Sequence, residues 1–215
     1  MGDSRRHNSP SLTLLAAMCI GLLFSGLAIG VALGGLMPLP YGPVGPVAQY
    51  VRTQPLAVHI IAVAVFGSSV LLAVYAATAS ARLRSLGVTG ASPAMALTGG
   101  ILAAGSLGLT GLLGWTLSRP EITGDTTLVR ALYLLTFLVG GIAHVVALGV
   151  LIAGMAAGGQ LPRALTRAGV AIAALCELAT LVLVWPLLGP ILPVARVAAL
   201  VWLIVAGARL GHSQI

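Results

Sequence analysis

Six long apolar runs limit the folds that this chain can adopt. They cover residues 12–36, 56–79, 95–117, 129–157, 165–187 and 190–210. Each is long enough to cross a hydrocarbon core, which takes about 20 residues of α-helix. Because lipid has no hydrogen-bonding groups, a spanning segment must satisfy its own backbone. The runs are continuous rather than alternating in polarity, so they predict helices and not a β-barrel.

The shortage of charged side chains supports the same class. Charged residues make up 7% of the 215 residues and apolar residues 59%, whereas an ordinary globular domain has about 25% charged residues. This composition excludes soluble, disordered, fibrous and disulfide-rich proteins. We therefore predict an all-α polytopic membrane protein, a bundle of six transmembrane helices, with residues 1–215 as a single domain in a lipid bilayer.

The net charge of +7 comes from arginines that stand singly or in pairs between the apolar runs. They form no basic stripe, so no nucleic-acid partner is expected. With a cytoplasmic N-terminus, the inner side holds Arg5, Arg6, Arg82, Arg84, Arg163, Arg167 and Arg209. The outer side then holds Arg52, Arg119, Arg130 and Arg196. Seven against four predicts a multi-pass protein of the inner (plasma) membrane with both termini in the cytoplasm.

Two connections have a composition that predicts their shape. Residues 37–55 contain five prolines, so they cannot form one regular helix. The link at 186–190 is short and contains two prolines and a glycine, which makes the fifth and sixth segments an antiparallel hairpin.

Rows of small residues mark two of the predicted helices. Gly26, Gly30 and Gly34 share one face of the first helix, as in small-xxx-small helix packing. This face is either an oligomer interface or a packing surface within the monomer, and the sequence favours the second. In the third helix, Gly100 and Gly108 form a similar row with an alanine between them, which predicts a central helix.

Glu177 is the most informative residue, because it lies near the middle of the fifth run. An ionisable residue at that depth costs about 2–3 kcal/mol and is a functional hypothesis by default. Its helical neighbours include Ala173, Ala174 and Thr180, which are small. We therefore expect Glu177 to point into the bundle.

Two residues are candidate partners of Glu177. His144 lies near the middle of the fourth run, which is antiparallel to the fifth, so a contact between the two side chains is reasonable. Such a pair could bind a proton or a cation, or it could be a structural hydrogen bond. Arg196, in the sixth run, is a rival partner, although its long side chain is expected to extend to the outer interface.

Metal and cofactor sites are not expected. His59 lies near one end of the second run and His144 near the middle of the fourth, so both cannot ligate one haem iron or another metal. Cys19 and Cys176 lie inside apolar runs, as packing cysteines do. No catalytic motif is present, so an enzyme is the least supported class.

Short motifs in the last quarter of the chain carry a resemblance. A Leu-Pro-Arg sequence at 161–163 opens the fifth helix, and Leu192-Pro193 with Arg196 precedes a final helix with Trp-Leu-Ile at 202–204 and Gly207. This arrangement resembles uncharacterised multi-pass membrane proteins of actinobacteria. The resemblance implies a bacterial inner-membrane protein and no particular activity.

Two hypotheses about function follow. The first is a non-enzymatic carrier or sensor of a small solute, coupled to a proton or cation, in which Glu177 acts with His144 or Arg196. The alternative is a structural or accessory subunit whose glycine faces pack against a second copy or another membrane protein.

Overall fold

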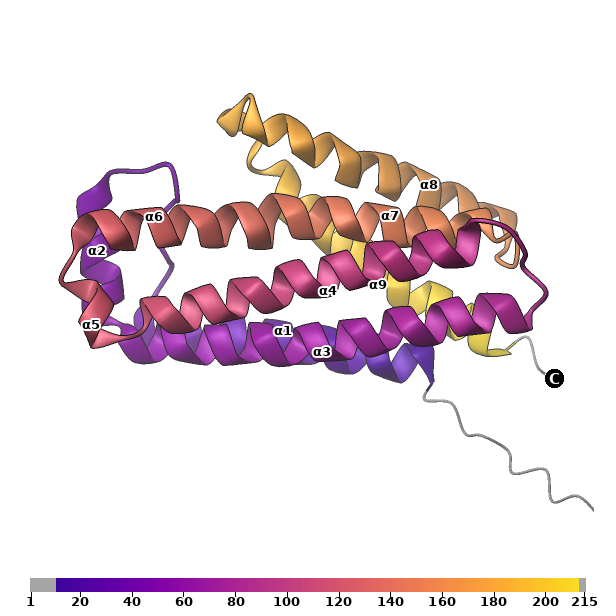
Figure 1. Cartoon of the computed structure of the whole chain (residues 1–215), viewed down its shortest axis with the longest axis horizontal. Coiled ribbons are helices and arrows are strands. Elements are labelled where there is room, and N and C mark those ends of the chain that lie inside the picture. The colour runs from indigo at the N-terminus through magenta and orange to yellow at the C-terminus, as the bar shows by residue number, and fades with distance from the viewer. Residues whose placement is uncertain (1–10, 213–215) are drawn as a thin grey trace, which may run out of the picture.

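The computed structural model describes residues 11–212, and every regular element in that range is a helix (Figure 1). The α-helices are α1 (Leu12–Gly34), α2 (Val44–Thr53), α3 (Pro55–Ser85), α4 (Ser92–Leu117), α5 (Pro120–Thr123), α6 (Thr126–Phe137), α7 (His144–Ala157), α8 (Arg163–Leu178) and α9 (Ile191–His212). A π-helical turn, η1 (Leu138–Ala143), joins α6 to α7. Two 3₁₀ segments, η2 (Ala179–Leu183) and η3 (Pro186–Leu188), join α8 to α9. Six helical segments are long and apolar enough to cross a membrane, which confirms the predicted class.

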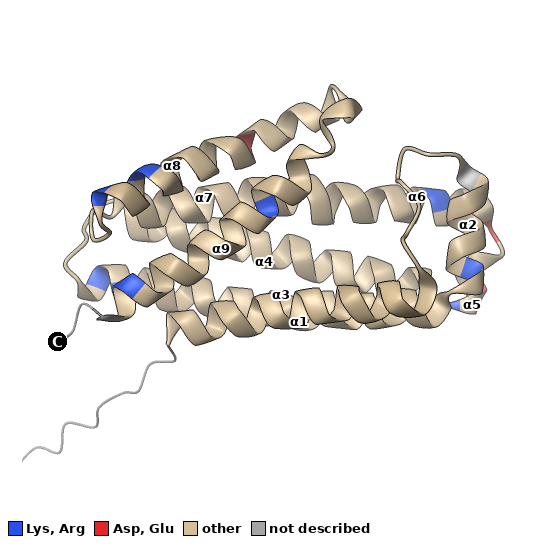
Figure 2. Ribbon diagram, turned by 180° about the vertical axis from the view of Figure 1, so that it is seen from behind, with Lys and Arg blue, Asp and Glu red and all other residues tan. Residues whose placement is uncertain are grey.

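The spanning helices form a closed bundle in which sequence neighbours are mostly spatial neighbours. α1 packs on α3, α3 on α4, α4 on α7, and α7 on α8. α9 then lies between α8 and α1 and also contacts α7, so the last helix closes the ring. α9 crosses α7 and α4 at an angle, behind them in Figure 1 and in front of them in Figure 2.

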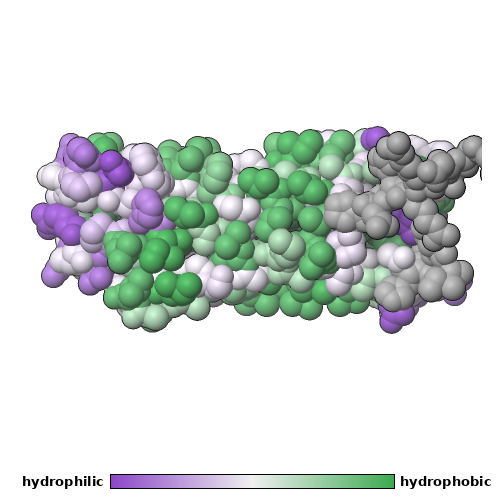
Figure 3. Space-filling view, turned by 90° about the horizontal axis from the view of Figure 1, so that it is seen from below, coloured by the Kyte–Doolittle hydropathy of each residue, from purple (hydrophilic) through white to green (hydrophobic). Residues whose placement is uncertain are grey.

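Hydrophilic residues gather at the two ends of the bundle, and an apolar band lies between them (Figure 3). Most charged residues follow this division in Figure 2, and the exceptions are one basic residue on α9 and one acidic residue on α8 that lie between the two ends. The end with α2 and α5 holds Arg52, Arg119, Glu121, Asp125 and Arg130. The opposite end holds Arg82, Arg84, Arg163, Arg167 and Arg209. Arg5 and Arg6, which the sequence places with this second group, lie outside the described residues.

Several helices begin at residues suited to cap them. The Ser11 hydroxyl accepts a hydrogen bond from the Leu14 amide (3.2 Å), and one carboxylate oxygen of Asp125 accepts from the amides of Thr127 (2.8 Å) and Leu128 (3.1 Å). These bonds satisfy amide groups that have no partner within the helix.

Glycine allows close approach of the backbones in α1, α3, α4 and α7. The glycine row of α1 faces α3: Gly26 lies against Ala64, and Gly30 lies against Ile61. Gly100 and Gly108 of α4 likewise face α3, while Gly99 and Gly154 bring α4 and α7 together. The central position predicted for the third spanning helix follows from these contacts. The glycine row of α1 is used within the chain and is not free to receive another protein.

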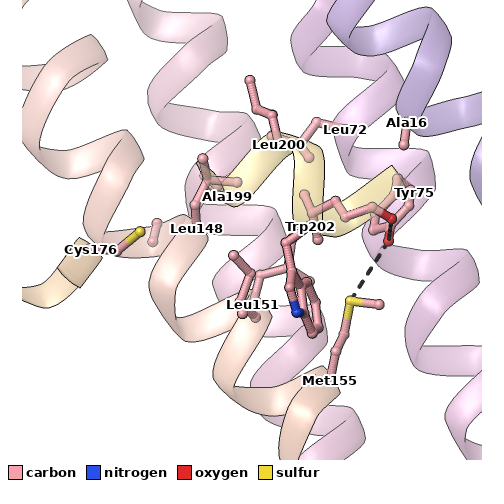
Figure 4. Packing of buried hydrophobic residues seen from close by; sticks show 14 of the residues in the cluster. Ala16, Leu72, Tyr75, Leu148, Leu151, Met155, Cys176, Ala199, Leu200 and Trp202 are labelled. Carbon is pink, nitrogen blue, oxygen red and sulfur yellow. Dashed lines mark hydrogen bonds between the residues drawn. The ribbon is translucent and has the colours of Figure 1, made fainter. Parts of the chain in front are cut away.

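The main core lies where α3, α7 and α9 meet (Figure 4). Tyr75 is 1% exposed, and its hydroxyl donates to the backbone oxygen of Leu203 (2.9 Å) and lies 3.8 Å from the sulfur of Met155. The indole N–H of Trp202 donates to the backbone oxygen of Leu165 on α8 (2.9 Å). These bonds connect helices that are far apart in the sequence.

The proline-rich connection covers one end of α6. Its second half forms the short helix α2, and its first half lies over α6 as an irregular segment. Arg130 donates to the backbone oxygen of Gly42 (2.7 Å), and Tyr133 donates to that of Pro38 (2.5 Å). The expectation that 37–55 is not one regular helix agrees with this arrangement.

The α8–α9 hairpin is the loosest part of the bundle. α8 diverges from α7 toward its C-terminal end (Figure 1), where it continues as η2 rather than as an α-helix. The side chains at the end of η2 and directly after it are 59–66% exposed, namely Leu183, Val184 and Trp185. The short turn predicted at 186–190 is present, but the fifth helix ends earlier than the sequence predicts.

Candidate functional site

Three ionisable residues lie at the same level of the bundle on α7, α8 and α9. His144, Glu177 and Arg196 are each 13 or 14 residues from Ala157, Arg163 and Arg209, which lie at one end of the bundle. At a rise of 1.5 Å per residue, each is about 20 Å from that end. This level lies well inside a hydrocarbon core of about 30 Å.

The π-helical turn η1 leads directly into His144. The His144 amide reaches back five residues to the backbone oxygen of Val139, whereas an α-helix would use the oxygen of Gly140. The Gly140 oxygen instead accepts a hydrogen bond from the Nη2 atom of Arg196 on α9. Because Gly140 has no side chain, Thr110 of α4 also packs directly on it. The turn therefore joins α4, α7 and α9.

His144 is fully buried and has one hydrogen-bonded ring nitrogen. Its Nδ1 atom lies 2.9 Å from the backbone oxygen of Ala103 on α4. Since a carbonyl can only accept, Nδ1 carries a proton and donates. The Nε2 atom is buried and has no hydrogen-bond partner among residues 11–212. In the neutral ring this atom is an acceptor, and in the protonated ring it is a donor.

Arg196 turns inward instead of extending to the interface. Besides Nη2, its Nε atom is buried, and within the described part of the chain this N–H has no acceptor. No carboxylate in that range pairs with Arg196, and the ion pair between Arg119 and Glu121 (3.8 Å) lies at the bundle end. Gly140, whose carbonyl accepts from Arg196, lies four residues before His144 on the same helical segment. The expectation that Arg196 extends to the outer interface is therefore wrong, because the Gly140 carbonyl gives it an internal acceptor.

His144 and Arg196 thus form a polar centre inside an apolar bundle, which we call the His144–Arg196 centre. It holds one unpaired donor on Arg196 and one unpaired ring nitrogen on His144. A buried polar atom without a partner is energetically unfavourable by about 1–3 kcal/mol. The centre can therefore gain free energy from a small polar ligand that accepts from Arg196.

Glu177 lies outside this centre. Its side chain is exposed on the bundle surface, and its Oε1 atom lies over Gly149 of α7. It forms no ion pair with His144 or Arg196 in the structure of residues 11–212. The expectation that Glu177 points inward is wrong. The neighbouring Cys176 takes the inward position instead and is fully buried.

His59 belongs to the periphery. Its Nδ1 atom lies 3.3 Å from the hydroxyl of Ser118. That hydroxyl already donates to the backbone oxygen of Trp115 (2.6 Å), so His59 is the donor to Ser118. The bond joins α3 to the end of α4, away from the His144–Arg196 centre.

An apolar cavity of about 70 Å³ lies beside the π-helical turn, between α3, α4 and α6. Thr110 lines this cavity and also packs on Gly140. The hydroxyls of Thr110 and Thr136 donate to their own helices, to Ser106 (2.8 Å) and Leu132 (2.7 Å), so the cavity wall is apolar. The cavity provides room for the π-helical turn to move.

Sequence reasoning selected His144 and Arg196 but missed what connects them. Gly140, the first of two consecutive glycines shortly before His144, supplies the acceptor for Arg196. A glycine pair three residues before a buried histidine was the available signal. Glycine in mid-helix both weakens the helix and exposes its carbonyl.

Comparisons with known proteins add no relative. No protein-family model, curated protein or solved structure matches this chain. The resemblance of the last quarter of the chain to actinobacterial membrane proteins therefore stays a prediction, and the chain is established as an all-α, multi-pass membrane protein by its six apolar helices.

Proposed function

We propose that the protein is a non-enzymatic membrane carrier that binds a small anion together with a proton at the His144–Arg196 centre. One observation carries this proposal. The half-buried guanidinium of Arg196 donates to a backbone carbonyl, has a buried Nε donor without an acceptor, and has no carboxylate partner within residues 11–212. A buried cation without a counter-charge favours an anion.

The proton follows from the chemistry of His144. A protonated His144 beside Arg196 places two cations close together in a medium of low dielectric constant, which is unfavourable. An anion that accepts from Arg196 offsets this repulsion and accepts a second bond from Nε2. Anion binding and protonation of His144 therefore favour each other, as linkage requires.

The close packing limits the size of the ligand. Both unpaired nitrogen atoms are buried, so the structure is a closed state of the carrier. Binding requires the π-helical turn or α9 to move. A centre enclosed by packed side chains favours a small ion such as chloride, nitrate or formate.

The orientation and the membrane are part of this proposal. The bundle end with Arg82, Arg84, Arg163, Arg167 and Arg209 has no acidic residue among those described, whereas Glu121 and Asp125 lie at the other end. The positive-inside rule then places the arginine-rich end in the cytoplasm. We assign the protein to the plasma membrane of a bacterium, in line with the resemblance of its last helices.

Proteoliposomes test the proposal. An inward gradient of chloride, nitrate or formate, with the membrane potential clamped, should drive proton uptake that a pH-sensitive dye reports. Arg196→Gln and His144→Asn should each slow the initial rate by about tenfold or more, because a hydrogen bond to a charged group contributes about 1.5–3 kcal/mol. Arg84→Gln is the matched control, since Arg84 is exposed at the bundle end.

Size-exclusion chromatography separates loss of function from loss of folding. If Arg196→Gln does not fold, Arg196→Lys keeps the charge while removing the Nε donor. The proposal fails if no anion gradient moves protons, or if well-folded Arg196 and His144 variants transport as fast as the original chain.

A further inference from the structure

Glu177 leaves a carboxyl group uncovered at mid-depth on the bundle surface. It lies about 20 Å along α8 from Arg163, and the exposed neighbours on its helix are apolar, among them Val170 and Leu178. From this level, a glutamate side chain cannot reach the arginine-rich end of the bundle. The carboxyl group therefore faces hydrocarbon unless another molecule covers it.

Within residues 11–212, neither the charged nor the neutral form of this carboxyl has an ionic or hydrogen-bonding partner. Among residues 11–212 there is no ion pair to Glu177 and no donor bonded to its carboxyl. The nearby hydroxyl of Thr180 donates to the backbone oxygen of Glu177 instead (2.7 Å). A charged carboxylate lacks a counter-charge, and a neutral carboxyl lacks an acceptor for its proton, so both forms are costly in lipid.

The surface around Glu177 has the shape of a helix-packing site. Its Oε1 atom lies 2.9 Å from the point where a Cβ on Gly149 would lie, so the carboxyl rests at the seam between α7 and α8. Ala174 and Ala171, about one and nearly two turns before Glu177, are exposed and small. Small residues let another helix approach closely, and interhelical hydrogen bonds then stabilise the contact.

A second copy of the chain does not supply the missing counter-charge. Among the described residues, His144 and Arg196 are the basic side chains at this depth, and the donor atoms of both are directed into their own bundle. The other arginines among residues 11–212 lie at the bundle ends. A cationic partner for Glu177 must therefore come from a different protein.

From these observations we infer that the outer face of α8 around Glu177 binds a transmembrane helix of a different protein, one with a basic side chain near its middle. The contact would pair that cation with Glu177 at the seam of α7 and α8. This inference depends on Glu177 alone and is independent of the anion carrier proposed above.

The test uses the full-length protein in phosphatidylcholine vesicles and a leucine-rich transmembrane peptide with one central arginine. Energy transfer between labelled protein and labelled peptide reports binding. The arginine peptide should bind about tenfold more tightly than the same peptide with a central leucine. Glu177→Leu should remove this preference, and Glu177→Gln should reduce it if the leucine variant does not fold. Glu121→Gln, at an exposed glutamate outside the bundle core, should keep it.

Two results would overturn the inference. One is equal binding of both peptides, or an arginine preference that persists in Glu177→Leu and Glu177→Gln. The other is self-association of the protein without peptide that Glu177→Leu abolishes, because the occupant would then be a second copy. Proton and anion flux is measured separately, in the original chain and in Arg84→Gln. A failure of peptide binding therefore does not count against the carrier.

Discussion

Two regions of the bundle are built on different principles. The packing of α1, α3 and α4 depends on glycines that let backbones touch, and these helices carry no Arg, His, Asp or Glu at mid-depth. The group formed by α7, α8 and α9 holds all three such residues at one level. Burial varies most within this second group: 56% of the most apolar window in the α6–α7 segment is buried, against 28% in the α8 segment.

This difference indicates that one region stabilises the fold and the other can move. Where backbones touch, any side chain added at the contact must displace main chain, so the first region is fixed in one arrangement. In the second region, a π-helical turn, a 3₁₀ segment and unpaired polar atoms leave several arrangements close in free energy. We therefore place the moving parts in α7–α9 and the frame in α1, α3 and α4.

The largest effect expected is from a side chain added between α3 and α4. A Cβ at Gly111 would lie 2.8 Å from the backbone nitrogen of Phe66 and 2.9 Å from the backbone oxygen of Ala62. Gly111→Leu should therefore destabilise the fold by about 3 kcal/mol or more. Gly105→Leu is the matched control on the same helix, because nothing lies within 4 Å of a Cβ there. Thermal unfolding in detergent gives the melting temperatures of both variants. Equal values would contradict the claim that close backbone packing fixes α1, α3 and α4.

Hydrogen exchange should sharpen the contrast between regions. Amides of residues 179–190, which include η2 and η3, should exchange at least about a hundredfold faster than those of residues 96–111 in α4. The reason is that the first range is exposed and only partly helical, whereas the second lies between α3 and α7. Mass spectrometry of the detergent-solubilised protein gives both rates. Similar protection in the two ranges would show that the hairpin is as rigid as the frame.

Tyr75 forms one of the hydrogen bonds that connect the two regions. Tyr75→Phe removes the bond to the Leu203 carbonyl on α9 and leaves that buried oxygen without this donor. We expect a loss of about 1 kcal/mol in the free energy of unfolding. Tyr41→Phe is the control, since Tyr41 is 43% exposed. An unchanged midpoint in chemical unfolding of Tyr75→Phe would mean that the bond contributes nothing to holding α9.

The smallest expected effect is on the pH dependence of the melting temperature, through Tyr50 of α2. Burial raises the pKa of Tyr50, whose hydroxyl donates to the backbone oxygen of Gly35 (3.2 Å). The stabilisation from neutral Tyr50 is complete below the unfolded pKa of about 10 and is lost as the pH rises above it. The melting temperature should therefore fall less between pH 9 and 11 in Tyr50→Phe than in the original chain. Parallel curves for the two proteins would argue against a buried Tyr50 hydroxyl.

The sequence predicted the helices because membrane crossing depends on local composition. The predicted run 95–117 corresponds to Ser92–Leu117, and the run 129–157 to Thr126–Ala157, with the differences confined to helix ends. Transfer of apolar side chains into hydrocarbon is a property of each segment alone. Agreement to within a few residues is therefore expected.

The direction of each polar side chain depends instead on how a helix is rotated against its neighbours. Small residues flank Glu177 on both sides, and the structure buries Ala173 while exposing Ala174. The inward position goes to Cys176, which packs on Gly149. The π-helical turn adds a residue to the helix before His144 and frees the oxygen of Gly140, which no periodicity in the sequence reveals. Three candidates at one depth were thus predictable, but which two of them meet was not.

The most direct test of the central claim is a proton count during anion binding. Nitrate, chloride or formate is added to detergent-solubilised protein in weak buffer at pH 7, with gluconate holding the ionic strength constant. We expect uptake of about one proton per anion bound, and loss of this uptake in His144→Asn. Anion binding that releases or absorbs no protons, or that absorbs them equally in His144→Asn, would contradict a coupled His144–Arg196 centre.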